Sequence, residues 1–262
     1  MRRTPALEES HRVGVKPLPL LRPLAWLALG WQDLRRCPGP ALLHGAALAL
    51  FGAVLLWAAR GQFWWLAGAF SGFLLVAPVL ATGLYAISRA LSRGEAAGLR
   101  TAMDAWRPRD GRLVAFGLLL ALAGTGWVLT SASLITRFAA GPVDNPADFL
   151  RVVVLREDSL LFECWLALGG VLAAPIFASS VVALPLLLDR RIGVLAAVLT
   201  SWRVVMANPA PLALWAALIM LLTFAGMATA MLGLLLVVPL LGHASWHAYR
   251  ELVDASALPE TS

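Results

Sequence analysis

Charged side chains are scarce in this sequence. Only 14% of its 262 residues are charged, whereas a soluble domain averages roughly a quarter. The charges that remain are clustered, and the stretches between them are nearly uncharged. A helix needs about 20 apolar residues to cross a hydrocarbon core of about 30 Å. The sequence therefore predicts an integral membrane protein of all-α class, a polytopic transmembrane helical bundle.

Cysteines and catalytic motifs are also few. The two cysteines, Cys37 and Cys164, are predicted to lie near opposite faces of the membrane, so no disulfide framework is expected. The sequence contains no GxSxG, HExxH or CxxC pattern and no phosphate-binding Gly-Lys-Ser/Thr loop. Because no segment outside the membrane exceeds a short loop, a hydrolase or kinase domain has no place. We expect no catalytic residues, no cofactor and no enzymatic activity.

The net charge of +6 does not indicate a nucleic-acid-binding protein. The basic residues, of which 20 of 21 are arginine, stand beside apolar stretches, where they orient spans and contact anionic headgroups. The expected partners are membrane lipids, with other membrane proteins as an open possibility, and no nucleic acid.

Six apolar stretches are predicted to cross the membrane. The last region is the most informative, because no charged residue occurs in the 46 positions from Val204 to Tyr249. One helix of that length would reach about 69 Å, twice the membrane core, so it must fold back between Thr223 and Gly233. The predicted spans are about Pro40–Ala59, Phe63–Ser88, Leu113–Ile135 and Leu160–Leu188, then two spans within Val204–Tyr249.

The positions of lysine and arginine predict the orientation. Seventeen lie on the side of the termini and four on the other, and cytoplasmic loops carry the excess. We therefore expect a bacterial inner-membrane protein with both ends in the cytoplasm. A disordered arm over residues 1–22, a membrane domain over 23–252, a periplasmic loop over 137–159 and a cytoplasmic tail over 253–262 complete this organisation. In the loop, Val152–Leu155 is predicted either as a short surface helix or as a packed loop.

The sequence also suggests a threefold internal repeat. Trp31 precedes Pro38 by seven residues, Trp202 precedes Pro209 by the same spacing, and Trp106 stands before the third span. Each tryptophan lies in a segment with the pattern of an amphipathic helix. The predicted unit is an interfacial helix followed by a two-span hairpin, and its copies cover about 23–89, 98–191 and 192–250.

Four motifs resemble a known family. They are Gly30-Trp31-Gln32-Asp33-Leu34-Arg35-Arg36, Gly83-Leu84-Tyr85, Leu184-Pro185-Leu186-Leu187-Leu188-Asp189-Arg190-Arg191 and the stretch from Pro239 to Arg250. Together, over about residues 20–252, they resemble the bacterial polytopic membrane proteins of domain-of-unknown-function family 2189. The family defines no functional residues, although some members are labelled as cytochrome c oxidase subunits.

Histidine is too rare for that label to mean an oxidase core. Such a core needs six membrane histidines for two haems and a copper, and this chain has four histidines in all. His243 and His247 have helical ligand spacing, and His44 is predicted in the same leaflet. These three are weak candidates for a haem or metal site. The alternative is that they are interfacial residues of an aromatic belt.

The leading functional hypothesis is a non-enzymatic scaffold or accessory factor of a membrane complex. One alternative is a permease or lipid-handling transporter, suggested by repeated, proline-broken spans. It is weakened because Glu163 is the sole acidic residue inside a predicted span, and proton-coupled transporters generally need a buried carboxylate. A second alternative is a haem- or metal-binding accessory to a respiratory oxidase.

Overall fold

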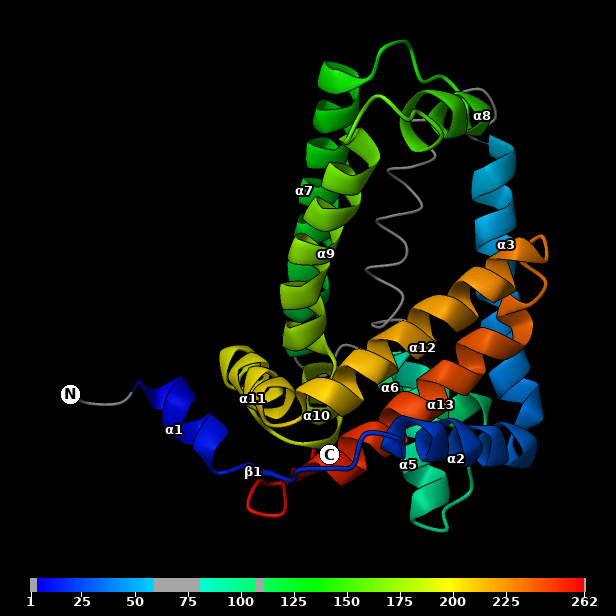
Figure 1. Cartoon of the computed structure of the whole chain (residues 1–262). Coiled ribbons are helices and arrows are strands. Elements are labelled where there is room, and N and C mark those ends of the chain that lie inside the picture. The colour runs from blue at the N-terminus through cyan, green and yellow to red at the C-terminus, as the bar shows by residue number, and fades with distance from the viewer. Residues whose placement is uncertain (1–3, 59–80, 107–110, 262) are drawn as a thin grey trace. The chain divides into compact units, whose positions relative to one another are not determined.

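The computed structural model describes residues 4–58, 81–106 and 111–261, and these residues are mostly helical (Figure 1). Within them, strands β1 (Gly14–Val15) and β2 (Val253–Asp254) pair antiparallel. The predicted all-α class is confirmed. The helices are α1 (Pro5–His11), α2 (Arg22–Arg36), α3 (Pro38–Ala58), α5 (Thr82–Ser92), α6 (Leu99–Trp106), α7 (Arg112–Phe138), α8 (Pro146–Phe149), the π-helix η1 (Leu150–Val154), α9 (Leu161–Ser180), α10 (Ala183–Asp189), α11 (Val194–Ala207), α12 (Pro209–Ala228) and α13 (Leu234–Leu252).

Four stretches in the described residues are long and apolar enough to cross a membrane. They are Pro38–Leu55 in α3, α7, the stretch Leu161–Asp189 formed by α9 and α10, and α12. Each corresponds to a predicted span. The chain therefore has several membrane-spanning candidates, as its composition predicted, but six spans are not confirmed.

The second and sixth predicted spans are not among these four candidates, and the reason differs between them. The second prediction, Phe63–Ser88, falls largely on residues 59–80, outside the described residues, and its end forms α5. The sixth corresponds to α13, whose first turns are apolar but whose second half carries His243, His247 and Arg250. The fold-back before α13 lies where the charge-free run predicted it, between Ala228 and Leu234.

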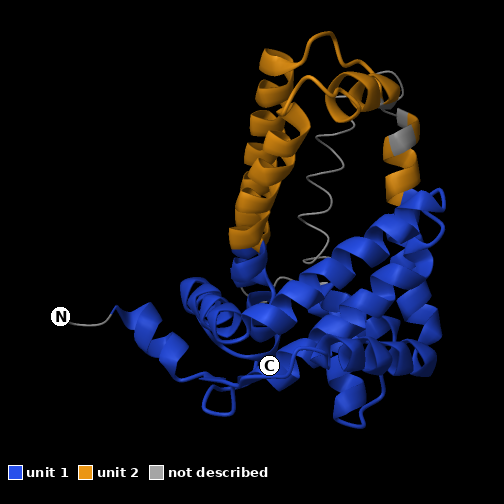
Figure 2. Ribbon diagram, in the orientation of Figure 1, with its two compact units in different colours: residues 1–50, 78–116, 177–262 blue, residues 51–77, 117–176 orange. Residues whose placement is uncertain are grey.

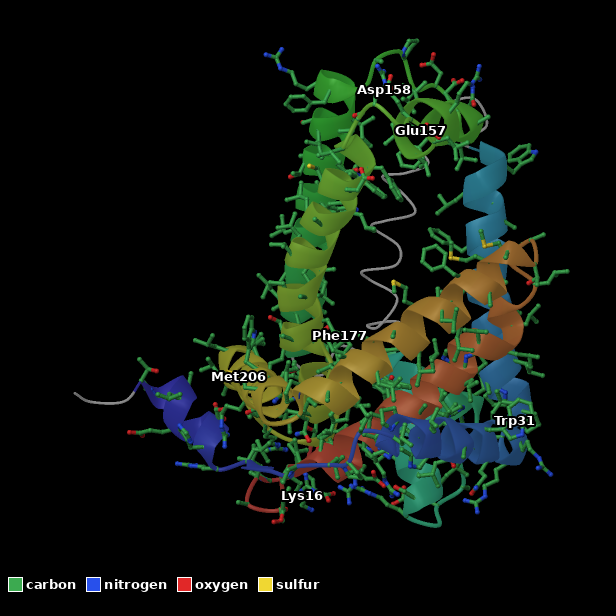
Figure 3. The ribbon with its side chains drawn as sticks, in the orientation of Figure 1. Lys16, Trp31, Glu157, Asp158, Phe177 and Met206 are labelled. Carbon is green, nitrogen blue, oxygen red and sulfur yellow. The ribbon has the colours of Figure 1, made fainter. Side chains whose placement is uncertain are left out.

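The predicted repeat unit begins with a short helix followed by a span, and the observed helices occur in this order. The short helices α2, α6 and α11 each stand directly before a candidate span, namely α3, α7 and α12. Trp31 in α2 is 43% exposed (Figure 3) and Trp202 in α11 is 39% exposed. The side chain of Trp106 lies outside the described residues. The threefold repeat itself stays a prediction.

The chain divides into two units (Figure 2). Unit 1 comprises residues 1–50, 78–116 and 177–262, and unit 2 comprises residues 51–77 and 117–176. In unit 1, α13 packs against α2, α5, α10 and α12, while α1 packs against α11. Unit 1 thus brings together three parts of the chain that are far apart in sequence.

Residues 4–22 correct the prediction of a disordered arm, because they form α1 and β1. Asn208, at the start of α12, accepts a hydrogen bond from Leu18 N at 2.8 Å and donates to Lys16 O at 3.1 Å. Arg203 of α11 donates to Val13 O at 3.2 Å. The arm is ordered because side chains nearly 200 residues away bind its backbone, a signal that local composition does not carry.

In unit 2, aromatic rings contribute to the contact between α7 and α9. Trp165 of α9 lies with its ring centroid 5.7 Å from that of Trp127 and 5.4 Å from that of Phe149. Its Nε1 donates a hydrogen bond to Ser131 Oγ at 2.6 Å. Between these helices, α8 and η1 occupy Pro146–Val154, and Val153 is fully buried. The predicted run Val152–Leu155 is thus helical as far as Val154 but packed, which combines the two alternatives.

Candidate functional site

Asp33 of α2 is the centre of a polar core in unit 1. It is only 4% exposed. Its Oδ2 atom accepts hydrogen bonds from Ser88 Oγ of α5 at 2.7 Å and from His247 Nε2 of α13 at 2.8 Å. Three helices separated by up to 214 residues therefore meet at one carboxylate oxygen. We call Asp33, Ser88, His243 and His247 the polar core.

Ser88 links the carboxylate to a second histidine. Its Oγ lies 2.7 Å from His243 Nδ1, and both residues are fully buried. A hydroxyl has one proton to give, and Ser88 donates it to Asp33. His243 must then donate from Nδ1, which leaves the Nε2 atom of a neutral ring as an acceptor. That Nε2 atom is buried without a hydrogen-bond partner among the described residues.

The charge of Asp33 is maintained by its neighbours. Burial favours the neutral form, but the hydrogen bonds from His247 and Ser88 outweigh it and hold the pKa of Asp33 below its ordinary value. The carboxylate is therefore the acceptor of both hydrogen bonds at neutral pH. A buried carboxylate that accepts several hydrogen bonds holds together the helices that supply the donors.

Two glycines allow α13 to approach the helices that carry these groups. A Cβ atom at Gly30 of α2 would lie 2.7 Å from Ala244 N and 2.8 Å from Leu240 O, both backbone atoms of α13. A Cβ at Gly242 of α13 would lie 2.5 Å from Leu84 Cδ1 of α5. Only a residue without a side chain permits such close contact between helices.

The three weak candidates for metal ligands have different surroundings in the structure. It brings His243 and His247 together, but each side chain is engaged with Ser88 or Asp33. His44 of α3 is buried, and its Nδ1 lies 2.7 Å from Pro40 O of the same helix. Within residues 4–58, 81–106 and 111–261, no group of three histidine, cysteine, aspartate or glutamate side chains is arranged to hold a metal.

Ser88, His243 and Asp33 contain the residue types of a hydrolytic triad, but in another order. In a triad the histidine lies between serine and carboxylate and takes the serine proton. Here the serine lies in the middle, and its hydroxyl donates a hydrogen bond to the carboxylate. Its oxygen is thus an acceptor from His243 rather than an activated nucleophile, and it is fully buried. The arrangement joins helices.

A second set of contacts holds the start of α2 to the end of α13. Glu251 accepts hydrogen bonds from Arg22 and, at 2.8 Å, from Trp26 Nε1. Trp26 is fully buried and meets Trp215 of α12 edge to face, with ring centroids 5.5 Å apart. The hydrogen bond from Arg22 is the main reason that the pKa of Glu251 lies below its ordinary value.

Asp189, at the end of α10, is a second buried carboxylate. Its Oδ2 accepts hydrogen bonds from Tyr249 Oη at 2.8 Å and from Arg190 Nε at 3.1 Å. Sequence reasoning quoted Asp33 only inside a motif, considered Asp189 only as part of a cytoplasmic turn with Arg190 and Arg191, and assigned no role to Ser88. The signal was available for the two carboxylates, since each is an acidic residue beside an apolar segment.

Part of the chain is similar to a known protein family. Residues 65–189 match the model of a family described as "Predicted integral membrane protein (DUF2189)". The resemblance drawn from the sequence is thereby confirmed, although over a shorter stretch than residues 20–252. The match includes Ser88 and Asp189 but not Asp33 or His243. No curated protein and no solved structure matches the chain.

Proposed function

We propose that the protein, whose residues 65–189 match a family of predicted integral membrane proteins, is a non-enzymatic scaffold or accessory factor of a membrane complex. It resides in the bacterial inner membrane with both termini in the cytoplasm. The observation that carries the proposal is the direction of the hydrogen bond at Ser88. Because Ser88 donates this bond to Asp33, the residues best suited to chemistry serve to join α2, α5 and α13.

The surface of unit 2 supports the same proposal. In the membrane-spanning window of α7, only 17% of residues are buried. Its outward side chains include Leu118, Leu122 and Leu129, which are 62%, 69% and 63% exposed. Lipid tails are as apolar as leucine, so partner helices bind such a face through packing and hydrogen bonds. We assign part of this face to another membrane protein and the remainder to lipid.

Photo-crosslinking in intact membranes tests the proposal. A photoreactive amino acid at Leu122 should give one discrete protein adduct, whereas the same probe at Leu120, which is 5% exposed on the same helix, should give none. The captured protein should also co-purify in fixed stoichiometry from mild detergent. If Leu122 gives lipid adducts alone and the protein purifies alone, the scaffold proposal fails.

The orientation has its own test. In a variant without Cys37 and Cys164, a membrane-impermeant maleimide should label Asp144→Cys in intact spheroplasts, because Asp144 lies in the predicted periplasmic loop. Ser256→Cys, in the predicted cytoplasmic tail, should react only after the membrane is opened. The reverse pattern would overturn the assigned orientation.

A further inference from the structure

A small cavity in unit 1 lies beside Asp189. Its volume is about 160 Å³, and a liquid water occupies about 30 Å³, so the cavity has room for a group the size of several waters. It is formed by α5, the end of α10, α13 and the C-terminal segment. Its lining residues are Arg89, Ser92, Arg93, Asp189, Arg190, Trp246, Arg250 and Glu260.

Cationic groups outnumber anionic groups in this arginine pocket. Four guanidinium groups face two carboxylates, those of Asp189 and Glu260. Two arginines have short contacts with these carboxylates. Arg190 Nε lies 3.1 Å from Asp189 Oδ2, and Arg93 Nη2 lies 2.9 Å from Glu260 Oε2. The pocket as a whole keeps a formal excess of two positive charges.

The other two arginines reach Asp189 only at longer range. Arg89 Nη1 lies 4.0 Å from Asp189 Oδ1, and Arg250 Nη1 lies 3.8 Å from Asp189 Oδ2. Both separations exceed the length of a hydrogen bond. Arg89 donates to Leu188 O at 3.2 Å, and the Arg250 side chain is 53% exposed. Among the described residues, much of the donor capacity of these two guanidinium groups therefore has no acceptor.

Trp246 adds an unsatisfied donor in the wall of the pocket. Its side chain is 1% exposed, and its Nε1 has no hydrogen-bond partner among the described residues. An indole nitrogen can only donate, and a buried donor without a partner is costly. One acceptor, Asp189 Oδ1, also lacks a hydrogen bond, but Arg93 lies 3.7 Å from it. The pocket thus offers more hydrogen-bond donors than acceptors, which favours a ligand rich in acceptors.

We propose that the arginine pocket binds a phosphate oxyanion, supplied by an anionic lipid headgroup or by a soluble phosphate compound. Arginine presents a planar set of donors that matches phosphate oxygens. The lining residues Arg89, Asp189 and Arg250 each follow the end of a predicted span on the cytoplasmic side, where anionic lipids create a negative surface. The site goes beyond the scaffold proposal and does not depend on it.

Two binding measurements test the site and distinguish the sources. In the first, inorganic phosphate is titrated by calorimetry into the full-length protein in phosphatidylcholine nanodiscs. In the second, the midpoint of thermal unfolding is compared between phosphatidylcholine discs and discs containing phosphatidylglycerol, in phosphate-free buffer. Binding in the first arm alone indicates a soluble ligand, stabilisation in the second alone indicates a headgroup, and both together indicate a site open to either.

Three variants decide whether the effect belongs to the pocket. Arg250→Gln should weaken the response about tenfold, as expected for the loss of a hydrogen bond to a charged group. Glu260→Gln removes a competing carboxylate, so it should strengthen the response severalfold; Glu260 is half exposed, and its replacement should leave the fold intact. Arg35→Gln, an exposed arginine of α2, should leave the response unchanged. Absence of a response in both arms, or equal losses in Arg250→Gln and Arg35→Gln, would overturn the proposal.

Discussion

Unit 1 and unit 2 join their helices by different kinds of contact. In unit 1, the buried carboxylates Asp33 and Asp189 accept hydrogen bonds from distant helices. In unit 2, α7 and α9 meet through the rings of Trp127 and Trp165 and a hydrogen bond to Ser131. A buried carboxylate that loses its donors is costly, whereas helices in lipid lose little when a neutral hydrogen bond breaks. Unit 1 should therefore be the more sensitive to single substitutions.

The largest effect is expected from Gly30→Ala. The new Cβ would lie within 3 Å of backbone atoms of α13, which cannot move as a side chain can. We expect a loss of more than about 3 kcal/mol, the upper range for overpacking a core, measured by denaturant unfolding with tryptophan fluorescence. Gly39→Ala is the matched control, because nothing lies within 4 Å of its Cβ position. Equal effects of the two variants would show that α2 does not pack closely on α13.

Asp33→Asn should have the next largest effect. An amide cannot accept both hydrogen bonds as strongly as the carboxylate, and His247 and Ser88 lose their charged partner. We expect a loss of about 2–3 kcal/mol, near the upper range for hydrogen bonds to a charged group. The matched control in unit 2 is Asp148→Asn. Its carboxylate contacts Asn145 and Arg151 near the surface, so the loss should stay below about 1 kcal/mol. A larger loss for Asp148→Asn would reverse the comparison.

Lowering the pH should reduce the unfolding free energy of unit 1. Asp33 and Glu251 both have a pKa below their ordinary values of 3.8 and 4.5. A carboxyl with a lowered pKa in the folded state contributes stability above its unfolded pKa and loses it as the pH falls through the folded pKa. The unfolding free energy should therefore decline from pH 5 toward pH 3, a window set by those two ordinary values. Trp26, which donates to Glu251, should report the change, and Asp33→Asn should flatten part of the slope. A slope unchanged in Asp33→Asn would mean that Asp33 does not contribute.

The smallest effect is expected in unit 2, from Ser131→Ala. This change removes the acceptor for Trp165 Nε1. Hydrogen bonds between membrane helices average about 0.6 kcal/mol, so the unfolding free energy should fall by about that amount. Thr130→Ala is a suitable comparison, because its hydroxyl bonds to Gly126 O within α7. A loss above about 2 kcal/mol for Ser131→Ala would show that unit 2, like unit 1, depends on a buried polar contact.

Composition and periodicity predicted the helices and the membrane character well, because both follow from local apolar patterns. The fold-back before α13 was predicted for the same reason, since a charge-free run has a length that the bilayer limits. The polar half of α13 was predicted to be the end of a span, which is not confirmed. Alone, His243 and His247 have the pattern of interfacial residues, and their partner Asp33 lies more than 200 residues away.

Only part of the candidate site was predicted, because its residues are also far apart in the sequence. His243 and His247 were selected by their spacing, but spacing suggested metal ligation where the structure has hydrogen bonds to Ser88 and Asp33. Ser88 has no sequence signal, since a lone serine near the end of an apolar segment is common. The order of residues 4–22 likewise depends on Asn208 and Arg203, which no local pattern connects to the arm.

The bond between Asp33 and His247 also bears on how the protein is made. The two residues are 214 positions apart, and at about 5–20 residues per second a ribosome needs roughly 10–40 s to synthesise the segment between them. Throughout that interval, the candidate spans in α3, α7, α9 and α12 emerge while Asp33 has no histidine to bind. The sequence predicts α2 at the membrane surface, where water can solvate the carboxylate until α13 arrives. The candidate spans are therefore synthesised before unit 1 can close, and a chain halted before residue 247 would contain them with the polar core still open.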